Sequence, residues 1–423
     1  MGTMASSTHQ FEVLDLIRAG LQDLDTARTL LDELRADGID DDRLCLLMKT
    51  LEQTCEPDIA LRNLVDIIKA LQSQGRDFHQ VITDDAGLVR LVTVLGVSDG
   101  MGKLMRFRPE LVMAAASDSC ESHLYNHAQR RAHVLEAVGA DPADNRMPKA
   151  TKPLAEAATA LRQTYRKQLA AIMAQDATAD DPIEIQPRIS QELSDLADAA
   201  LEGALAIARN EVDGSEHVRF AIIGMGKLGA RELNYVSDVD LIYVVEPADK
   251  DTNGMTFNRV GTKMATTLQR VCQSVIMGVA EPTLWQIDGG LRPEGKDGPL
   301  VRKLESHKAY YEQWAENWEF QALLKARPVA GDPDLGQAYM DMTRPFVWTA
   351  SKRDNFVYDC QQMRKRVEDL IPAPLKDREI KLGRGGLREV QITLQLLPHV
   401  HGRAEETLPT STTLESLQLH AEL

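Results

Sequence analysis

The sequence predicts an α+β protein in which a small mixed sheet lies between two helical regions of the chain. Three observations predict this class. Apolar residues recur with the helical period of about 3.6 residues from residue 10 to about residue 170. Two apolar segments of strand length, 218–223 and 239–245, then follow one another closely. Helical patterns resume at Pro333 without the repeated strand–helix units of a doubly wound sheet.

The individual elements follow in chain order. Early apolar faces, such as Leu14, Ile17, Leu21 and Leu24, indicate core-facing helices. A polar turn at 177–184 precedes an Ala/Leu-rich helix expected over 189–210, and a long helix is expected from 255 to about 278. Alternation over 284–288 predicts a short strand, and Pro and Gly residues predict breaks at 372–374 and 383–386.

These changes divide the 423 residues into three expected regions. A helical N-terminal region covers residues 1–184, a catalytic domain with the sheet covers 185–330, and a helical C-terminal region covers 331–423. A chain of this length can bury a large core and is long enough for two or three domains.

Composition narrows the classes of function. The chain has 64 acidic and 48 basic residues, for a formal net charge of −16. This balance disfavours nucleic acid as a partner, because phosphate backbones attract basic surfaces. The five cysteines show neither metal-binding spacing nor disulfide density, which indicates a reducing cytoplasm. No signal peptide and no apolar stretch of about 18 residues is seen, so we expect no membrane association.

The most informative segment joins the two strand candidates. Residues 224–241 read Gly-Met-Gly-Lys-Leu-Gly-Ala-Arg-Glu-Leu-Asn-Tyr-Val-Ser-Asp-Val-Asp-Leu. Asp238 and Asp240 are two residues apart at the start of a strand, so their side chains are expected on the same face. Carboxylate oxygens, together with substrate phosphates, are the ligands that Mg²⁺ prefers. The pattern favours metal-dependent transfer of a phosphorus-centred group.

A third carboxylate is expected to join this pair. Asp288 ends the short strand candidate, and two glycines follow it directly. Three carboxylates on neighbouring strands can hold one or two Mg²⁺ ions, or Mn²⁺ in their place, and so clamp the attacking and leaving oxygens. We therefore predict Asp238, Asp240 and Asp288 as catalytic and metal-binding residues.

Residues around these acids are candidates for contacting phosphate groups. The glycine turn would present backbone N–H groups to anionic oxygens, and nearby cations would neutralise them. Arg302 is a further counter-charge, whereas Asp297 is expected to be a solvated loop acid. The candidate phosphate-binding residues are Gly224, Gly226, Lys227, Ser237, Arg292 and Lys296.

The same glycines also match a competing motif. Gly224, Gly226 and Gly229 have the spacing of the dinucleotide fingerprint, with Glu246 at the end of the next strand. The helix candidate after Gly229 is short and polar, with no apolar stripe to pack on a doubly wound sheet. Its exit is turn-like, and no alternating units follow. We therefore expect no nicotinamide or flavin site.

At this level of detail the motifs resemble a known family. The segment 224–241 is similar to the nucleotidyltransferase signature of the glutamine synthetase adenylyltransferase/adenylyl-removing enzyme family. Four further segments resemble motifs of that family in the same order, namely 95–111, 288–300, 318–327 and 381–390. Two departures are Gly289-Gly290, where the family commonly has a bulky residue and an arginine, and Gln391, where it usually has a second acid.

The resemblance implies an Mg²⁺-dependent nucleotidyl transfer on glutamine synthetase. ATP, ADP and phosphate would be substrates or products, and a PII-type nitrogen signal protein would be a second partner. Such enzymes usually carry two nucleotidyltransferase domains, whereas this sequence shows one and runs to its end within a helix pattern at 412–420. We therefore expect it to correspond to the N-terminal, adenylyl-removing half.

Several alternatives stay open at this point. The resemblance implies that phosphate attacks adenylylated glutamine synthetase and releases ADP, but the same metal site could instead adenylylate the synthetase from ATP. A non-catalytic module that binds glutamine synthetase or a signal protein is a third hypothesis. Arg388 and Glu389 follow a double-glycine turn, where they could line the active site or form an ordinary ion pair.

Overall fold

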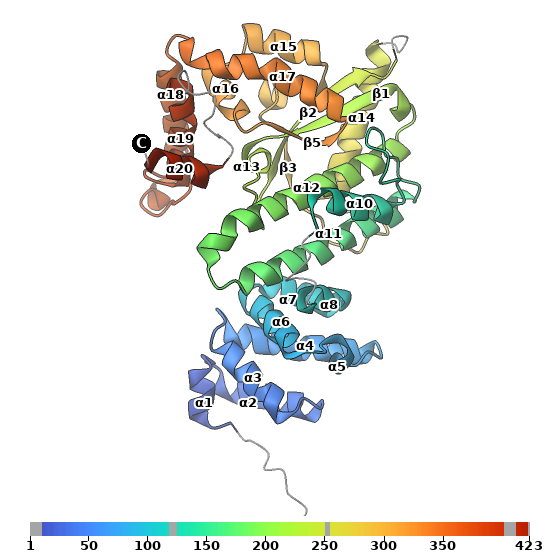
Figure 1. The fold of residues 1–423 in the computed structure, drawn as a ribbon, viewed down its shortest axis with the longest axis vertical. Helices are drawn as coiled ribbons and strands as arrows, with labels where there is room; N and C mark the ends of the chain where they lie inside the picture. The colour runs from blue at the N-terminus through green and yellow to red at the C-terminus, as the bar shows by residue number, and fades with distance from the viewer. Residues whose placement is uncertain (1–10, 118–124, 250–253, 402–411, 422–423) are drawn as a thin grey trace, which may run out of the picture. The chain divides into compact units, whose positions relative to one another are not determined.

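The computed structural model describes residues 11–117, 125–249, 254–401 and 412–421. The chain forms two compact units, one of Met1–Tyr125 with Tyr165–Ile189, and one of Asn126–Thr164 with Ser190–Leu423. Figure 1 gives the course of the chain through both units. The boundaries of the three regions expected from the sequence patterns, 1–184, 185–330 and 331–423, stay a prediction.

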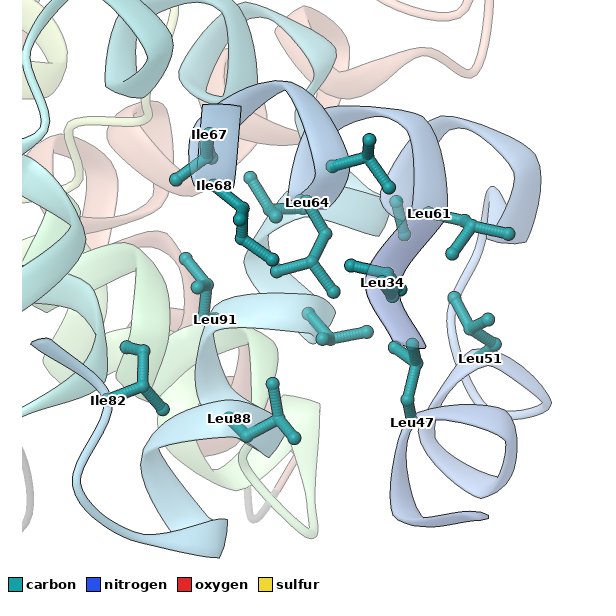
Figure 2. Close-up of a cluster of buried hydrophobic side chains, with 14 of the residues drawn as sticks. Leu34, Leu47, Leu51, Leu61, Leu64, Ile67, Ile68, Ile82, Leu88 and Leu91 are labelled. Atoms are coloured by element: carbon teal, nitrogen blue, oxygen red, sulfur yellow. The ribbon is translucent and has the colours of Figure 1, made fainter. Parts of the chain in front are cut away.

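The first unit is helical, as the apolar periodicity predicts. The expectation that Leu14 and Ile17 face the core is wrong: they are 54% and 55% exposed, because α1 buries Leu16 instead, whereas Leu21 is buried as expected. Its helices begin at acidic caps: the side chains of Asp23, Asp40 and Asp84 accept hydrogen bonds from the first turns of α2, α3 and α6. Apolar faces of these helices meet in one core, in which Leu34, Leu64 and other aliphatic side chains are buried (Figure 2). The helices are α1 Val13–Arg18, α2 Leu24–Ala36, α3 Asp41–Leu51, α4 Pro57–Ser73, α5 Phe78–Val81, α6 Asp85–Val97, α7 Asp99–Phe107 and α8 Glu110–Ala116.

The second unit contains a mixed five-stranded sheet, which confirms the α+β prediction. The strand order is β3-β2-β1-β5, and β4 also pairs with β2. Pairing is antiparallel between β1 and β2 and between β1 and β5, but parallel between β2 and both β3 and β4. The strands are β1 Val218–Gly224, β2 Val239–Pro247, β3 Ile287–Asp288, β4 Val301–Arg302 and β5 Arg327–Gly331.

The antiparallel pairing of β1 with β2 bears on the competing glycine motif. A dinucleotide-binding unit needs two parallel strands joined by a crossover helix. Here β1 and β2 are antiparallel neighbours joined by a short connection. Glu246 accepts a hydrogen bond of 3.0 Å from the backbone N–H of Leu304, at the start of α15. The expectation that the fingerprint does not form a dinucleotide fold is confirmed.

Helices cover both faces of this sheet. Alternate residues of β2 point in opposite directions. Ile242 and Val244 pack with Phe320 and Tyr339, in the core formed with α15 to α18. Tyr243, on the other face, lies beside α14. The remaining helices are α10 His127–Val138, α11 Leu154–Ala177, α12 Pro182–Glu211, α13 Gly226–Gly229, α14 Gly254–Gln273, α15 Leu304–Gln313, α16 Asn317–Leu323, α17 Pro333–Thr349, α18 Phe356–Asp369, α19 Leu387–His401 and α20 Thr413–Ala421, with 3₁₀ turns η1 Ser215–His217, η2 Gly295–Asp297, η3 Ala350–Lys352 and η4 Ala373–Leu375. The end of α11 and the start of α12, within Tyr165–Ile189, belong to the first unit.

Two helix bounds differ from those expected. α12 begins at Pro182 rather than at residue 189, because the Asp181 side chain accepts hydrogen bonds from the N–H groups of Ile183 and Glu184. α14 ends at Gln273 rather than at about residue 278, because the Cys272 carbonyl accepts a hydrogen bond from the Leu284 N–H instead of from the next helical turn. The breaks expected in the C-terminal region lie between α18 and α19, as predicted. Within the described residues, no helix is long and apolar enough to cross a membrane.

Candidate active site

A glycine turn lies directly beside the first predicted aspartate pair. After β1, the Met225 N–H donates a 2.9 Å hydrogen bond to the Asp240 carbonyl, which holds the turn against β2. Gly226 has φ +55°, and a Cβ atom there would lie 2.6 Å from Asp240 Oδ2. A Cβ at Gly229 would lie 1.8 Å from the Lys325 carbonyl oxygen. Glycine is required at Gly229, because the Lys325 backbone leaves no room for a side chain, and it is favoured at Gly226 by the positive φ.

The parallel pairing of β2 with β3 brings two of the predicted acids together. Asp240 and Asp288 are opposite one another in the register, and Asp238 directly precedes β2. Burial, the Asp288 charge and the Asp238 charge raise the pKa of Asp240 to about 6, and Arg388 and Lys381 oppose that increase. The charges of Asp238 and Asp288 thus both disfavour the ionised form of Asp240.

These acids offer what a divalent cation needs. Within the described part of the chain, no Lys or Arg forms an ion pair with Asp238, Asp240 or Asp288. Crowded carboxylates without a cationic partner are destabilising unless a metal ion neutralises them, and their oxygens suit a hard ion such as Mg²⁺. Their residue types therefore fit a metal site, and the assignment of the three as ligands stays a prediction.

A different group of side chains lies closest together. Among the described residues, the group of acidic or histidine side chains whose ligand atoms all lie within 4.8 Å of one another is His127, Asp195 and Asp198. The three predicted aspartates do not meet that distance. Arginines already neutralise this other group: Arg327 donates to both Asp198 oxygens, at 2.6 and 3.1 Å, and Arg231 pairs with Asp195. We therefore interpret it as a structural ion-pair network.

The predicted phosphate-binding cations have different surroundings. Lys227 is half-buried in the glycine turn, where burial and then the charge of Lys381 lower its pKa. Lys296 is exposed. Arg292 donates to the carbonyls of Gly289, Lys296 and Gly298 at 2.7 to 3.2 Å, so it braces its own loop in this structure. Phosphate contacts by these cations stay predictions.

Two other candidates make local contacts. The Ser237 hydroxyl donates to the Asp238 carbonyl at 3.0 Å, which stabilises the approach to β2. Arg302, expected as a counter-charge, pairs instead with Glu294 and lies over the Tyr310 ring at 5.9 Å. Arg302 therefore forms an ion pair with Glu294 and not with the three aspartates.

The structure distinguishes the two residues after the double-glycine turn. Glu389 accepts hydrogen bonds of 2.6 Å from Arg364 and from the Gly385 N–H, so it is an ion-pair residue. Arg388 is exposed, and its charge acts on Asp240. Lys381 acts on the same carboxyl and was not among the residues expected at the site. The glycine-rich run at 383–386 is the sequence signal that could have indicated both cations.

Comparison with known proteins supports the motif assignment. The profile of the glutamate-ammonia ligase adenylyltransferase family matches residues 88–342, which is more than half of the chain. The chain belongs to this family. A second profile, that of the PII-uridylyltransferase GlnD, matches residues 361–422.

Curated relatives from this family cover nearly the whole chain. A protein of Bifidobacterium longum (strain DJO10A) is 74% identical over 98% of the chain. A relative from Cutibacterium acnes is 42% identical over 96%, and one from Streptomyces coelicolor is 40% identical over 95%. All three are named bifunctional glutamine synthetase adenylyltransferase/adenylyl-removing enzyme. The chain spans 39%, 40% and 38% of their respective lengths.

Proposed function

We propose that this chain removes AMP from adenylylated glutamine synthetase by metal-dependent phosphorolysis. The observation that carries the proposal is the pairing of Asp240 with Asp288 on parallel strands, directly against the glycine turn at Gly226. Family membership supports glutamine synthetase as the protein substrate, because the names of the relatives describe both attachment and removal of an adenylyl group.

The chemistry proposed is one in-line displacement at phosphorus. An oxygen of inorganic phosphate forms a bond to the adenylyl phosphorus, and the bond from that phosphorus to the tyrosine oxygen breaks. The phenolate takes a proton from the attacking hydrogen phosphate or from water, which leaves ADP and the unmodified synthetase. The attacking group is already anionic, so no strong general base is needed.

The residues of the chain would bind the metal ions, align the reacting groups and neutralise the charge on the phosphate oxygens. Asp238, Asp240 and Asp288 would hold one or two Mg²⁺ ions, which supply charge neutralisation of the phosphate oxygens when bound. The turn at Gly226 and Lys227 would place N–H groups and a cation beside the anionic oxygens. Because the Asp240 pKa is about 6 without metal, its ionised form, which is the metal-binding form, predominates above that pH.

The direction of transfer rests on the resemblance to the adenylyl-removing half. It is tested by incubating the chain and Mg²⁺ with adenylylated glutamine synthetase, adding phosphate to one sample and pyrophosphate to another. A third sample contains unmodified synthetase and ATP. We expect phosphate-dependent release of ADP and little labelling of the synthetase from ATP. Efficient labelling without a response to phosphate would reverse the direction.

The assay also separates an enzyme from a binding module. The Asp240→Asn variant, purified in the same way, serves as the control for contaminating activity. Turnover by the wild-type chain that the variant lacks excludes the non-catalytic hypothesis. A PII-type nitrogen signal protein is proposed as a regulatory partner, supported by the similarity of residues 361–422 to a PII-uridylyltransferase.

A further inference from the structure

The segment that follows the glycine turn carries a half-buried carboxylate, that of Glu232. The Glu232 backbone N–H donates to the Lys227 carbonyl at 2.8 Å, so Glu232 closes the turn that contains Lys227. Its carboxylate contacts two other segments of the second unit, at Lys325 just before β5 and at Thr413, where α20 begins. One residue thus joins the glycine turn to two segments that are distant in the sequence.

The contacts of this carboxylate are charge-assisted and largely shielded from water. Lys325 Nζ donates to Glu232 Oε2 at 2.7 Å, and the two side chains are 8% and 17% exposed, respectively. The other oxygen, Oε1, accepts a hydrogen bond from the Thr413 N–H, and the Thr413 hydroxyl donates to Oε2 at 3.1 Å. Hydrogen bonds to charged groups are the stronger class, and removing one partner of a buried pair leaves an unpaired charge.

Lys325 also contacts the glycine turn through its backbone. A Cβ atom at Gly229 would lie 1.8 Å from the Lys325 carbonyl oxygen, so the Lys325 backbone lies directly against the turn. The ammonium group of the same residue is 3.4 Å from the Thr413 hydroxyl. The turn is therefore held by Lys325 and by Glu232, and both of these residues contact the start of α20.

Helix α20 is short enough to depend on these contacts. It has 9 residues, and isolated helices below about 12 to 15 residues are marginal in water. The Glu232 carboxylate satisfies an N–H group that has no partner within the helix, and its charge is favourable at a helix N-terminus. Residues of α19 and α20, among them Gln391 and Thr413, line a cavity of only about 10 Å³, so the two helices pack closely. Loss of the Glu232 contact should therefore release α20 as a unit.

We propose that Glu232 is a positioning residue for the glycine turn and that it couples nucleotide binding at the turn to the docking of α20. This inference rests on the proposed nucleotidyl transfer at the same site. With α20 docked, the Glu232 backbone holds the Lys227 carbonyl in place; with α20 released, Glu232 and the turn lose this restraint together. Because coupling between two sites is reciprocal, ADP with Mg²⁺ should stabilise docked α20 by the same factor by which docking raises ADP affinity.

Thr413→Pro tests the coupling in the full-length 423-residue chain. Proline lacks the N–H that Glu232 accepts, yet it is favoured at the first position of a helix, so the change removes the contact without breaking α20. We expect Thr413→Pro to raise the dissociation constant of ADP in Mg²⁺ about tenfold, measured by calorimetry. Thr413→Ala retains the N–H and should raise it about twofold. Glu232→Gln should raise it about tenfold or more, because Lys325 is then left without its charged partner.

Hydrogen exchange supplies a measurement that a purely structural role of Glu232 would not change. In the wild type, saturating ADP with Mg²⁺ should slow amide exchange in α20 about tenfold, as reciprocity requires. In Thr413→Pro the same addition should leave the exchange of α20 nearly unchanged, because the link between the helix and the turn is missing.

Asp332→Asn is the matched control. Asp332 pairs with Arg219 at 2.7 Å and its side chain is 6% exposed, so this change also disrupts a buried carboxylate paired with a cation in the second unit. Asp332 follows the end of β5, whereas Lys325 lies before its start, beside the glycine turn. The control should lower the melting temperature but keep ADP affinity within about twofold of the wild type.

The outcomes distinguish the coupling from the proposed reaction. Unchanged ADP affinity in folded Thr413→Pro and Glu232→Gln, or exchange in wild-type α20 that does not respond to ADP, would overturn the coupling and leave the phosphorolysis proposal in place. An equal loss of affinity in Asp332→Asn would also overturn it, because the weakening would then reflect general destabilisation. If the coupling is observed but the wild type releases no ADP from adenylylated synthetase, the coupling stands and the phosphorolysis proposal fails.

Discussion

At the scale of single residues, Asp240 has the least ordinary environment at the candidate site. It is half-buried, it faces Asp288 across the parallel pair, and the turn at Gly226 approaches its carboxylate. Burial raises its pKa first, and the neighbouring acids add to that effect. Without metal, the folded protein therefore binds a proton at Asp240 more tightly than the unfolded chain does.

Asp240→Asn should separate activity from stability. Removing one ligand charge should slow Mg²⁺-dependent turnover about a thousandfold. In EDTA the wild type should lose stability as pH rises from about 4 to above 6, because the ionised carboxylate is disfavoured in the folded state. The variant lacks this titration, so it should melt at a higher temperature than the wild type at pH 7.

Asp297→Asn is the control, because Asp297 is an exposed loop acid and should leave both properties nearly unchanged. Near-normal turnover by Asp240→Asn, or its unfolding in EDTA, would contradict the metal-site argument.

At the scale of elements, Arg327 connects three of them. From the start of β5 it donates to both oxygens of Asp198 on α12, at 2.6 and 3.1 Å. It also donates to the carbonyls of Leu228 and Gly229 at the end of α13, at 3.0 and 3.2 Å. One guanidinium group thus bonds to the end of the glycine turn and to the buried Asp198, whose other neighbour, His127 at 3.5 Å, is charged only when protonated.

Arg327→Gln should destabilise the protein by about 3 to 5 kcal/mol, since it leaves the Asp198 carboxylate buried without its cation. Denaturant unfolding measures the change. Adding Asp198→Asn to this variant should recover part of the loss, because the unpaired charge is then removed.

Arg146→Gln is a matched control for the Arg327 variant, because Arg146 pairs with Asp334 at an exposed site and should change stability by less than about 1 kcal/mol. A similar small effect of Arg327→Gln would show that the turn does not depend on this network.

At the scale of the whole molecule, the two compact units have separate cores. The helical unit buries its own aliphatic cluster, whereas the sheet and the predicted acids belong entirely to the other unit. Stability of the first core and nucleotide binding at the site should therefore be separable by mutation. Separate cores are typical of domains that fold as individual units.

Leu64→Ala tests this separation. Leu64 is 2% exposed in the helical core, so its truncation should cost about 2 to 5 kcal/mol of stability. Binding of ADP with Mg²⁺ at a temperature where the variant is folded should stay within about twofold of the wild type, since the site lies in the other unit.

Leu14→Ala, at a position that is 54% exposed, is the control and should be nearly neutral. Loss of ADP binding by the folded Leu64→Ala protein would show that the units are energetically coupled.

Much of the fold could be predicted from local sequence. Helical periodicity identified the helical regions, and two apolar runs identified β1 and β2. The short strand ending at Asp288 was also expected. These signals are local, because a helix face or a strand face is specified by spacings of a few residues. Element ends were less predictable, as α12 shows, because the Asp181 cap competes with the apolar pattern.

By itself, the sequence determined the chemical groups of the candidate site: a glycine turn, an aspartate pair at the start of one strand and a third aspartate at the end of a short strand. Only the tertiary structure decided which groups meet. The register of β2 with β3 places Asp288 opposite Asp240, and the charge of Arg388, from a distant part of the chain, acts on Asp240. In the folded chain, Arg302 forms an ion pair with Glu294. Spacing along the chain orients neighbouring side chains, but contacts between distant segments depend on strand register and core packing, which no local pattern encodes.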